Sequence, residues 1–286
     1  MAVAVVTDTT HYLPRPLLAA HDVHEVSLYV GWPGNDDLRR ESDIADLGSF
    51  YDELRTAATV PTTSQPSVGD VLAVYEPLLA AGHDIVSIHL SAGLSGTVST
   101  AEQARAASSR PERIEVVDSE TGCGGLGLAV LAAARAASGG ASTDEVAEAA
   151  RRAREGLKMW FCVDTLEYLR RGGRVGKAQS WIGGALKIKP ILALEREITP
   201  IERVRTASRA FERMVEYMEA LQEAGRDGWA IQHIRAGEQA SLLADRGRAI
   251  FGSEPLFVSE VGPVIGAHVG PGLLGVGGVA RGLLDA

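Results

Sequence analysis

Apolar and polar residues follow two different patterns along the first half of this chain. Short apolar runs are typical of buried strands, and stretches with an apolar residue every three or four positions are typical of amphipathic helices. The pattern predicts strands over residues 3–7, 23–30, 84–90 and 114–118. It predicts helices over residues 14–21, 44–58, 68–81, 95–107, 125–137 and 143–155. Two of these helices begin with capping boxes, Ser67-x-x-Asp70 and Ser142-x-x-Glu145.

Strands that are separated by helices favour parallel crossover units, so we expect a Rossmann-like α/β domain over residues 1–156. The second half alternates less regularly and predicts a mixed-sheet α/β domain over residues 157–286. Its expected strands cover residues 158–163, 229–234 and 256–260, an apolar run covers 188–194, and its expected helices lie around 178–186 and 207–224. No Pro- or Gly-rich linker separates the halves at Gly156. We therefore expect a closely packed join, and ligands favour the clefts at such joins.

Composition narrows the class of protein. The 286 residues are 45% hydrophobic and 23% charged, which is a soluble globular profile. The 28 Lys and Arg against 37 Asp and Glu give a net charge of −9, which weighs against nucleic acid as a partner. No apolar run reaches the ~20 residues of a membrane span, so we expect no membrane-spanning segment and a cytoplasmic protein. Cys123 and Cys162 have no CxxC spacing, and we expect two buried thiols and no metal site.

Two polar loops each precede a predicted helix. The first is Pro61-Thr62-Thr63-Ser64-Gln65-Pro66-Ser67, and the second is Ser91-Ala92-Gly93-Leu94-Ser95-Gly96-Thr97, directly after a buried strand. Backbone N–H groups and the positive end of the helix dipole at such a position attract an anion. Ordinary helix capping and turn formation is the alternative explanation.

The same region allows two enzymatic interpretations. Gly122-Cys123-Gly124-Gly125-Leu126-Gly127 has the G-x-G-x-x-G spacing of a dinucleotide-binding loop. Asp118 and Glu120 just before it would repel a pyrophosphate, so close helix–strand packing is the favoured role of these glycines. A serine hydrolase could use Ser95 with Asp118 or Asp164 and His268, but position 97 is Thr where a nucleophile elbow needs Gly.

Two further groups could serve an anion site. Arg174 follows two glycines and belongs, with Lys177, Lys187 and Lys189, to a basic cluster in an acidic chain. This cluster is either a solvated face or a counter-charge for an anion. His268 lies between small residues that could direct its imidazole into a cleft, although a lone histidine is more often structural.

Eight motifs, in order from residue 7 to residue 272, together resemble the DegV family of bacterial lipid-binding proteins. Each motif is weak alone, but their order and spacing are highly specific. They are Thr7-Asp8-Thr9-Thr10 with Tyr12-Leu13-Pro14, the loop at 61–67, the loop at 91–97, Val117-Asp118-Ser119, Gly172-Gly173-Arg174-Val175, Lys187-Ile188-Lys189-Pro190, Val204-Arg205-Thr206 and Ala267-His268-Val269-Gly270.

The resemblance implies a two-domain α/β protein that holds one long-chain fatty acid in a tunnel between its domains. It implies no cofactor and no catalytic activity of the chain itself, because a separate fatty acid kinase subunit phosphorylates the bound carboxyl group in some family members. The carboxylate contacts of the family map onto Thr63 and Ser95, and the supporting polar network maps onto Arg174 and His268. Arg205 matches a surface arginine that family members use for kinase docking.

Overall fold

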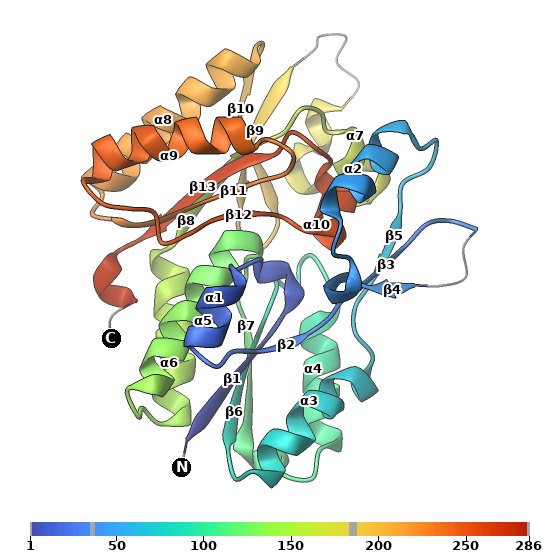
Figure 1. Cartoon of the computed structure of the whole chain (residues 1–286), viewed down its shortest axis with the longest axis vertical. Helices are drawn as coiled ribbons and strands as arrows, with labels where there is room; N and C mark the ends of the chain where they lie inside the picture. The colour runs from blue at the N-terminus through green and yellow to red at the C-terminus, as the bar shows by residue number, and fades with distance from the viewer. Residues whose placement is uncertain (1, 35–37, 183–187, 285–286) are drawn as a thin grey trace.

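The computed structural model of this protein describes residues 2–34, 38–182 and 188–284. Its first half contains a four-stranded parallel sheet (Figure 1). The strand order is β2-β1-β6-β7, with bounds His24–Val26, Val3–Asp8, Asp84–His89 and Ile114–Asp118. Helices α3 (Val68–Ala80) and α4 (Thr97–Ala107) pack on one face, and α5 (Cys123–Ser138) and α6 (Thr143–Gly156) pack on the other. Helices on both faces explain why β1 and β6 contain consecutive buried apolar residues, such as Val5-Val6 and Ile85-Val86, instead of a strict alternation.

A small antiparallel sheet replaces part of one expected strand. The segment 23–30 forms two strands, because the chain leaves the parallel sheet at Leu28, whose N–H donates to Thr9 Oγ1 at 3.3 Å. The second of these, β3 (Tyr29–Gly31), pairs with β4 (Arg39–Arg40) and β5 (Thr62–Ser64). The first half also contains the short helices α1 (Arg15–Ala20) and α2 (Leu47–Thr56).

The second half forms a six-stranded mixed sheet in the order β10-β9-β8-β13-β11-β12. Helices α8 (Ala207–Glu223) and α9 (Gly237–Phe251) share one core cluster with it and cover one of its faces (Figure 1). Two short helices, α7 (Glu167–Arg171) and α10 (Pro263–Val269), lie on the side of the first half. In sheet order the strands are Ile198–Val204, Lys189–Leu194, Lys158–Cys162, Leu274–Val279, Gly228–His233 and Val258–Glu260.

One expectation for this half needs correction. The helix expected at 178–186 is a 3-10 helix over Gly176–Trp181, and residues 183–187, which include Lys187, lie outside the described residues. The glycine-rich C-terminal part of the chain forms helix α10 and the buried strand β13 in the middle of the sheet. The α/β fold class, with a parallel sheet followed by a mixed sheet, is confirmed.

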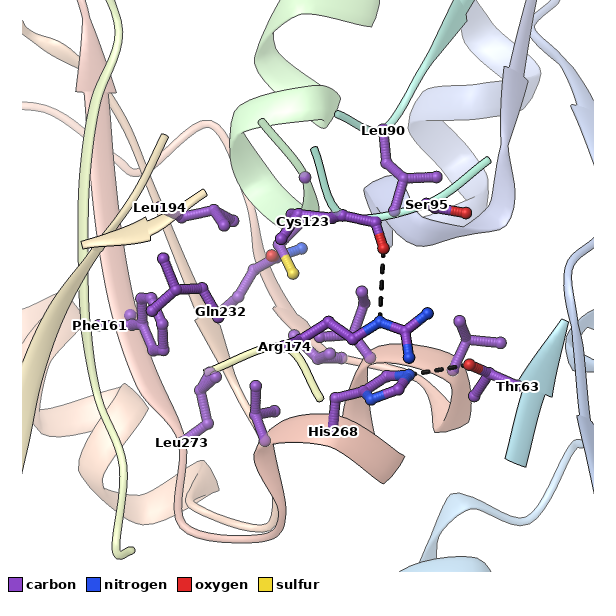
Figure 2. Close-up of a pocket in the computed structure, with 18 of the residues that line it drawn as sticks. Thr63, Leu90, Ser95, Cys123, Phe161, Arg174, Leu194, Gln232, His268 and Leu273 are labelled. Atoms are coloured by element: carbon purple, nitrogen blue, oxygen red, sulfur yellow. Dashed lines mark hydrogen bonds between the residues drawn. The ribbon is translucent and has the colours of Figure 1, made fainter. Parts of the chain in front are cut away.

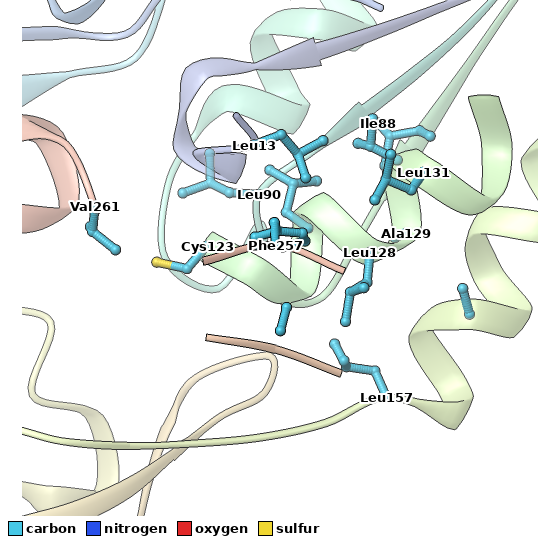
Figure 3. Packing of buried hydrophobic residues seen from close by; sticks show 14 of the residues in the cluster. Leu13, Ile88, Leu90, Cys123, Leu128, Ala129, Leu131, Leu157, Phe257 and Val261 are labelled. Atoms are coloured by element: carbon cyan, nitrogen blue, oxygen red, sulfur yellow. The ribbon is translucent and has the colours of Figure 1, made fainter. Parts of the chain in front are cut away.

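Helix α5 joins the two sheets. It contacts β1 of the parallel sheet and β11 and β13 of the mixed sheet, and one hydrophobic cluster runs through both halves (Figure 3). A Cβ at Gly125 would lie 2.7 Å from Leu157 Cδ2, and one at Gly127 would lie 3.0 Å from Leu13 Cδ2. The glycines of the G-x-G-x-x-G sequence thus allow close packing on both sides of the helix. The division into two domains after residue 156 stays a prediction.

Within the described part of the chain, no helix combines the length and the apolar character needed to cross a membrane. The same residues contain no cluster of His, Cys, Asp and Glu that could hold a metal ion.

Candidate functional site

A cavity of about 290 Å³ lies between the two halves of the protein, and both halves contribute to its wall (Figure 2). Most of its surface is apolar, with side chains such as Leu90, Phe161, Leu194 and Leu273. Its polar lining residues are few, and they come from both halves: Thr63, Ser64, Gln65, Ser95, Arg174, Gln232 and His268. An apolar cavity with a few polar groups suits an amphipathic ligand.

Thr63 and His268 meet at the polar part of the cavity. Thr63 lies in β5 and His268 on α10, and Thr63 Oγ1 is 2.8 Å from His268 Nε2 (Figure 2). Burial, with a smaller effect of the positive charge of Arg174, lowers the pKa of His268 to about 4. The imidazole is therefore neutral at neutral pH, and its Nε2 can either donate to Thr63 or accept from it.

Ser95 lies in the loop between β6 and α4. Its Oγ is 2.9 Å from Thr97 Oγ1 and accepts a long hydrogen bond of 3.4 Å from the N–H of Thr97. The hydroxyl thus lies just before the start of α4 (Thr97–Ala107), where the sequence predicts a polar loop that leads into a helix.

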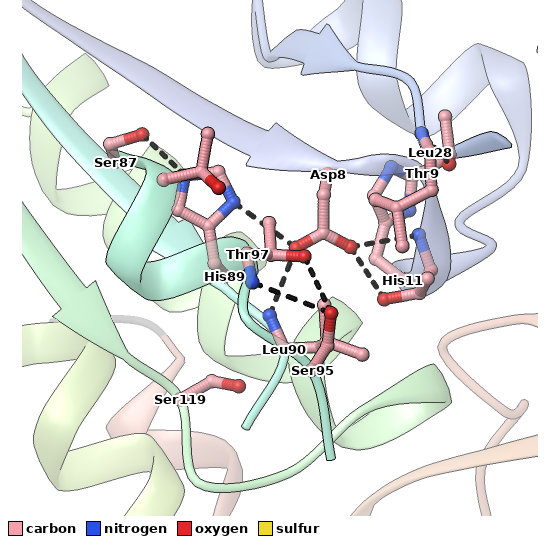
Figure 4. Close-up of polar contacts among 12 residues, drawn as sticks. Asp8, Thr9, His11, Leu28, Ser87, His89, Leu90, Ser95, Thr97 and Ser119 are labelled. Carbon is pink, nitrogen blue, oxygen red and sulfur yellow. Dashed lines mark hydrogen bonds and ion pairs between the residues drawn. The ribbon is translucent and has the colours of Figure 1, made fainter. Parts of the chain in front are cut away.

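A buried carboxylate anchors the strand end that precedes this loop (Figure 4). Asp8 Oδ2 accepts from the N–H of Leu90 at 2.9 Å and lies 3.1 Å from His89 Nδ1, while His89 Nε2 is 2.8 Å from Ser87 Oγ. Burial opposes the ionisation of Asp8, but the interaction with His89 and the hydrogen bonds from Thr10 and the Leu90 N–H together outweigh it, so the pKa of Asp8 is lowered. The end of β6, and the loop that follows it, is therefore held by an ionised side chain from β1.

Gln65 connects the two polar loops. Its Nε2 donates to Thr100 Oγ1 at 2.7 Å, and a Cβ at Gly96 would overlap its Oε1. The glycine at position 96 thus lets the first loop pack directly against the start of α4. This contact brings the segments of Thr63 and Ser95 together across one wall of the cavity.

Arg174 also lies at the cavity, whereas Arg205 does not. Arg174 Nε donates to the carbonyl oxygen of Leu94 at 3.5 Å, and one terminal nitrogen donates to that of Gly172 at 2.7 Å. Arg174 thereby links the second half to the loop that carries Ser95. Arg205 is exposed between β10 and α8 and does not contribute to the cavity lining.

Gln232 is a polar lining residue that the sequence analysis missed. It is 4% exposed, and its Nε2 donates to the carbonyl oxygen of His11 and to Ser259 Oγ, both at 3.1 Å. A single amide side chain within the apolar run 229–234 was the available signal.

The side chains proposed for a serine hydrolase do not form a triad. His268 bonds to Thr63 and Ser95 to Thr97, and no hydrogen bond joins Ser95 to His268 among the described residues. Asp118 Oδ1 accepts from the N–H groups of Ala92 and Glu120. Asp164 forms an ion pair with Lys189. The polar groups of the cavity are therefore arranged as hydrogen-bonding groups, without a base directed at Ser95.

Known proteins match this chain over almost its whole length. A sequence model of the DegV family of uncharacterised proteins matches residues 2–281. A DegV domain-containing protein of Streptomyces coelicolor is 43% identical over 277 residues, which cover 96% of this chain and 97% of that protein. Two solved structures superpose with a TM-score of 0.85 each, covering 98% of this chain and 99% of theirs. One is a DegV family protein from Thermus thermophilus, 32% identical and described for its fatty acid binding; the other is DegV from Bacillus subtilis, 34% identical and described as a fatty acid binding protein. On these matches and on its fold, this chain belongs to the DegV family.

Proposed function

We propose that this protein binds one long-chain fatty acid in the cavity between its two halves. The carboxylate lies at Thr63 and Ser95, with Arg174 and His268 supporting it, and the acyl chain lies among the apolar side chains. The observation that carries this proposal is the gathering of these four side chains at one apolar cavity. The description of two similar DegV proteins as fatty acid binding also supports it.

The chemistry of the lining fits such a ligand. Each buried CH₂ group contributes ~0.8 kcal/mol, so a sixteen-carbon chain gains about 12 kcal/mol before the entropy of binding is subtracted. A carboxylate must keep hydrogen bonds when it leaves water. The hydroxyls of Thr63 and Ser95 can supply them, and the guanidinium of Arg174 supplies a positive charge. His268 is neutral at pH 7 because its pKa is lowered to about 4, so it acts as a hydrogen-bonding group.

We further propose that the protein acts in the cytoplasm, without a cofactor, and presents the bound fatty acid to a separate kinase subunit that forms the acyl-phosphate. It takes no catalytic part itself. Arg205 is the proposed docking residue for that kinase, and its exposed position at the start of α8, apart from the cavity, supports this role. The two cysteines are buried and unpaired, which suits a reducing compartment.

Ligand extraction and matched variants test the binding site. Mass spectrometry of lipid extracted from the purified protein identifies the ligand. Thr63→Val and Ser95→Ala should each weaken palmitic acid binding by roughly ten- to hundred-fold, because each removes a hydrogen bond to a charged group worth about 1.5–3 kcal/mol. Binding of 1-hexadecanol, which has the same chain but no carboxylate, should change far less. Equal losses for acid and alcohol would contradict the assignment of the carboxylate contacts.

A further inference from the structure

A buried glutamate outside the cavity lining connects three separate segments of the chain. Glu41 is 6% exposed. Its Oε2 accepts from Thr9 Oγ1 at 2.6 Å, and its Oε1 accepts from the hydroxyl of Tyr12 at 2.9 Å and from the N–H of Val264 at 2.8 Å. The donors thus come from the segment after β1 and from the first turn of α10, which is 223 residues away in sequence. Burial of a carboxylate costs free energy even when three donors bind it, so we expect Glu41 to fulfil a structural role.

The same group of side chains holds the whole start of α10 (Pro263–Val269). The Tyr12 hydroxyl, which donates to Glu41, accepts from the N–H of Ile265 at 3.2 Å. On the other side, the Tyr51 hydroxyl lies 2.6 Å from the carbonyl oxygen of Val261 and 2.9 Å from that of Gly262. A Cβ at Gly262 would lie 2.7 Å from Glu41 Oε1, so the glycine allows the start of the helix to approach the carboxylate. The first half of the chain therefore fixes the position of this helix.

Helix α10 carries the histidine of the proposed carboxylate site. Val264, Ile265, His268 and Val269 all line the cavity, and His268 lies one turn after the residues that Glu41 and Tyr12 hold. The contact from His268 Nε2 to Thr63 Oγ1 is 2.8 Å, and a movement of about 1 Å would break it. On the opposite side of the ring, a Cβ at Gly172 would overlap Nδ1. The imidazole is thus confined, and its position depends on the helix.

We propose that Glu41 is a positioning residue for the carboxylate end of the cavity: by binding the first turn of α10, it holds the imidazole of His268 against Thr63. This inference rests on the proposed fatty acid binding for its functional half only. Its structural half, that Glu41 sets the environment of His268, stands without any ligand.

The structural half is tested by titrating His268 in ligand-free protein, with NMR of histidine-labelled samples. In Glu41→Ala, α10 loses its acceptor, so His268 should become more accessible and its pKa should rise from about 4 toward the ordinary range. Glu41→Gln keeps one oxygen that can accept from Val264 but cannot serve all three donors, and it should give a smaller rise. The matched control is Glu25→Gln, because Glu25 is also a hydrogen-bonded carboxylate but bonds to His11 and Arg15, away from α10. It should leave the pKa of His268 unchanged.

Should the alanine variant fail to fold, Glu41→Gln and Tyr12→Phe decide the question. An unchanged pKa of His268 in both of them overturns the proposal.

The functional half is tested by comparing palmitic acid with 1-hexadecanol in competition against a fluorescent fatty acid. Glu41→Ala should weaken binding of the acid by about tenfold, the loss of one good hydrogen bond, and should change binding of the alcohol by less than about twofold. If the pKa of His268 moves while acid binding is unchanged, the role of Glu41 at the carboxylate end is wrong. If the wild-type protein binds neither compound, the proposed function fails, while the titration of His268 still decides whether Glu41 positions the ring.

Discussion

The ionisation of Glu41 should make the stability of this protein fall as the pH rises toward neutrality. Burial raises the pKa of Glu41 from 4.5 to about 7, because the hydrogen bonds from Thr9, Val264 and Tyr12 only partly compensate for the lost hydration, and the charge of Asp8 adds to the effect. Tyr12 and Tyr51 beside it stay neutral below pH 8, since burial raises the pKa of each well above its usual value.

The sign and size of this effect follow from the two pKa values. Below pH 4.5 the carboxyl group is protonated in both folded and unfolded chains, and ionisation costs nothing. Between pH 4.5 and 7 the unfolded chain ionises first and is favoured, so stability is lost through this window and then stays constant. A difference of about 2.5 pKa units at ~1.4 kcal/mol each corresponds to roughly 3 kcal/mol of unfolding free energy.

Urea denaturation of wild-type protein and Glu41→Gln at pH 5, 6, 7 and 8 measures this contribution. The contributions of other titrating groups cancel when the two proteins are compared. The free energy of unfolding of the wild type minus that of Glu41→Gln should fall by up to about 3 kcal/mol from pH 5 to pH 8. Glu25→Gln provides a control whose difference from the wild type should stay constant across this series, because the contribution of Glu25 is lost only below pH 4.5. The pKa of Glu25 is lowered, because the hydrogen bonds and charges of His11 and Arg15 outweigh burial, so its contribution should be lost at low pH. A difference between wild type and Glu41→Gln that is constant or grows with pH would refute the reasoning.

Two further predictions concern the kinase surface and the loop of Ser95. Arg205→Ala should leave fatty acid affinity intact and lower the rate at which the partner kinase phosphorylates bound lipid, with a smaller difference at high salt; loss of lipid binding would contradict the docking role. Gly93→Ala should destabilise the protein by about 1–3 kcal/mol and weaken acid binding, because the new Cβ would overlap the backbone oxygen of Arg196. The matched control is Gly69→Ala in the first turn of α3, where a Cβ would have only a 3.7 Å contact with Ser67 Oγ. It should stabilise the protein by about 0.5 kcal/mol, and thermal melts of both variants measure the two effects.

The parallel sheet could be predicted because its local signals agree with its tertiary environment. The strands at 84–90 and 114–118 are rich in Ile and Val, and both faces of the sheet are covered by helices. The capping boxes at Ser67 and Ser142 form both of their reciprocal hydrogen bonds. These features depend on residues that are near one another in sequence, and pattern analysis captures such features well.

Strand β13 could not be predicted from its own residues, because glycine disfavours strands. Its sequence Leu-Gly-Val-Gly-Gly-Val suits the centre of the sheet for a reason that lies elsewhere. A Cβ at Gly277 would be 2.9 Å from Met159 Cε, and one at Gly275 would be 3.2 Å from Phe161 Cβ. The neighbouring strand β8 thus requires small residues, and only the assembled sheet shows this requirement.

The candidate site also contains residues that the sequence predicts and residues that only the structure reveals. Thr63 and Ser95 stand out in sequence because each lies in a polar loop before a helix, and the structure places both at the cavity. Glu41 gives no signal, because its acceptor role depends on Val264 and on the first turn of a helix that was not expected. The residues that touch a ligand can be found from local patterns, whereas those that hold them in place depend on distant segments.

The two buried carboxyl groups near the cavity suit an anionic ligand in different ways. Asp8 has a lowered pKa and is ionised, and its carboxylate is hydrogen-bonded to His89 and to the N–H of Leu90. Glu41 is partly protonated at neutral pH because burial raises its pKa to about 7. Neither group therefore opposes an incoming carboxylate with a full unpaired charge, and the guanidinium of Arg174 can attract it. A lysine in place of His268 would bury a positive charge, and the bound ligand would have to compensate for its lost hydration. The neutral imidazole of His268 avoids this desolvation cost and can still form a hydrogen bond.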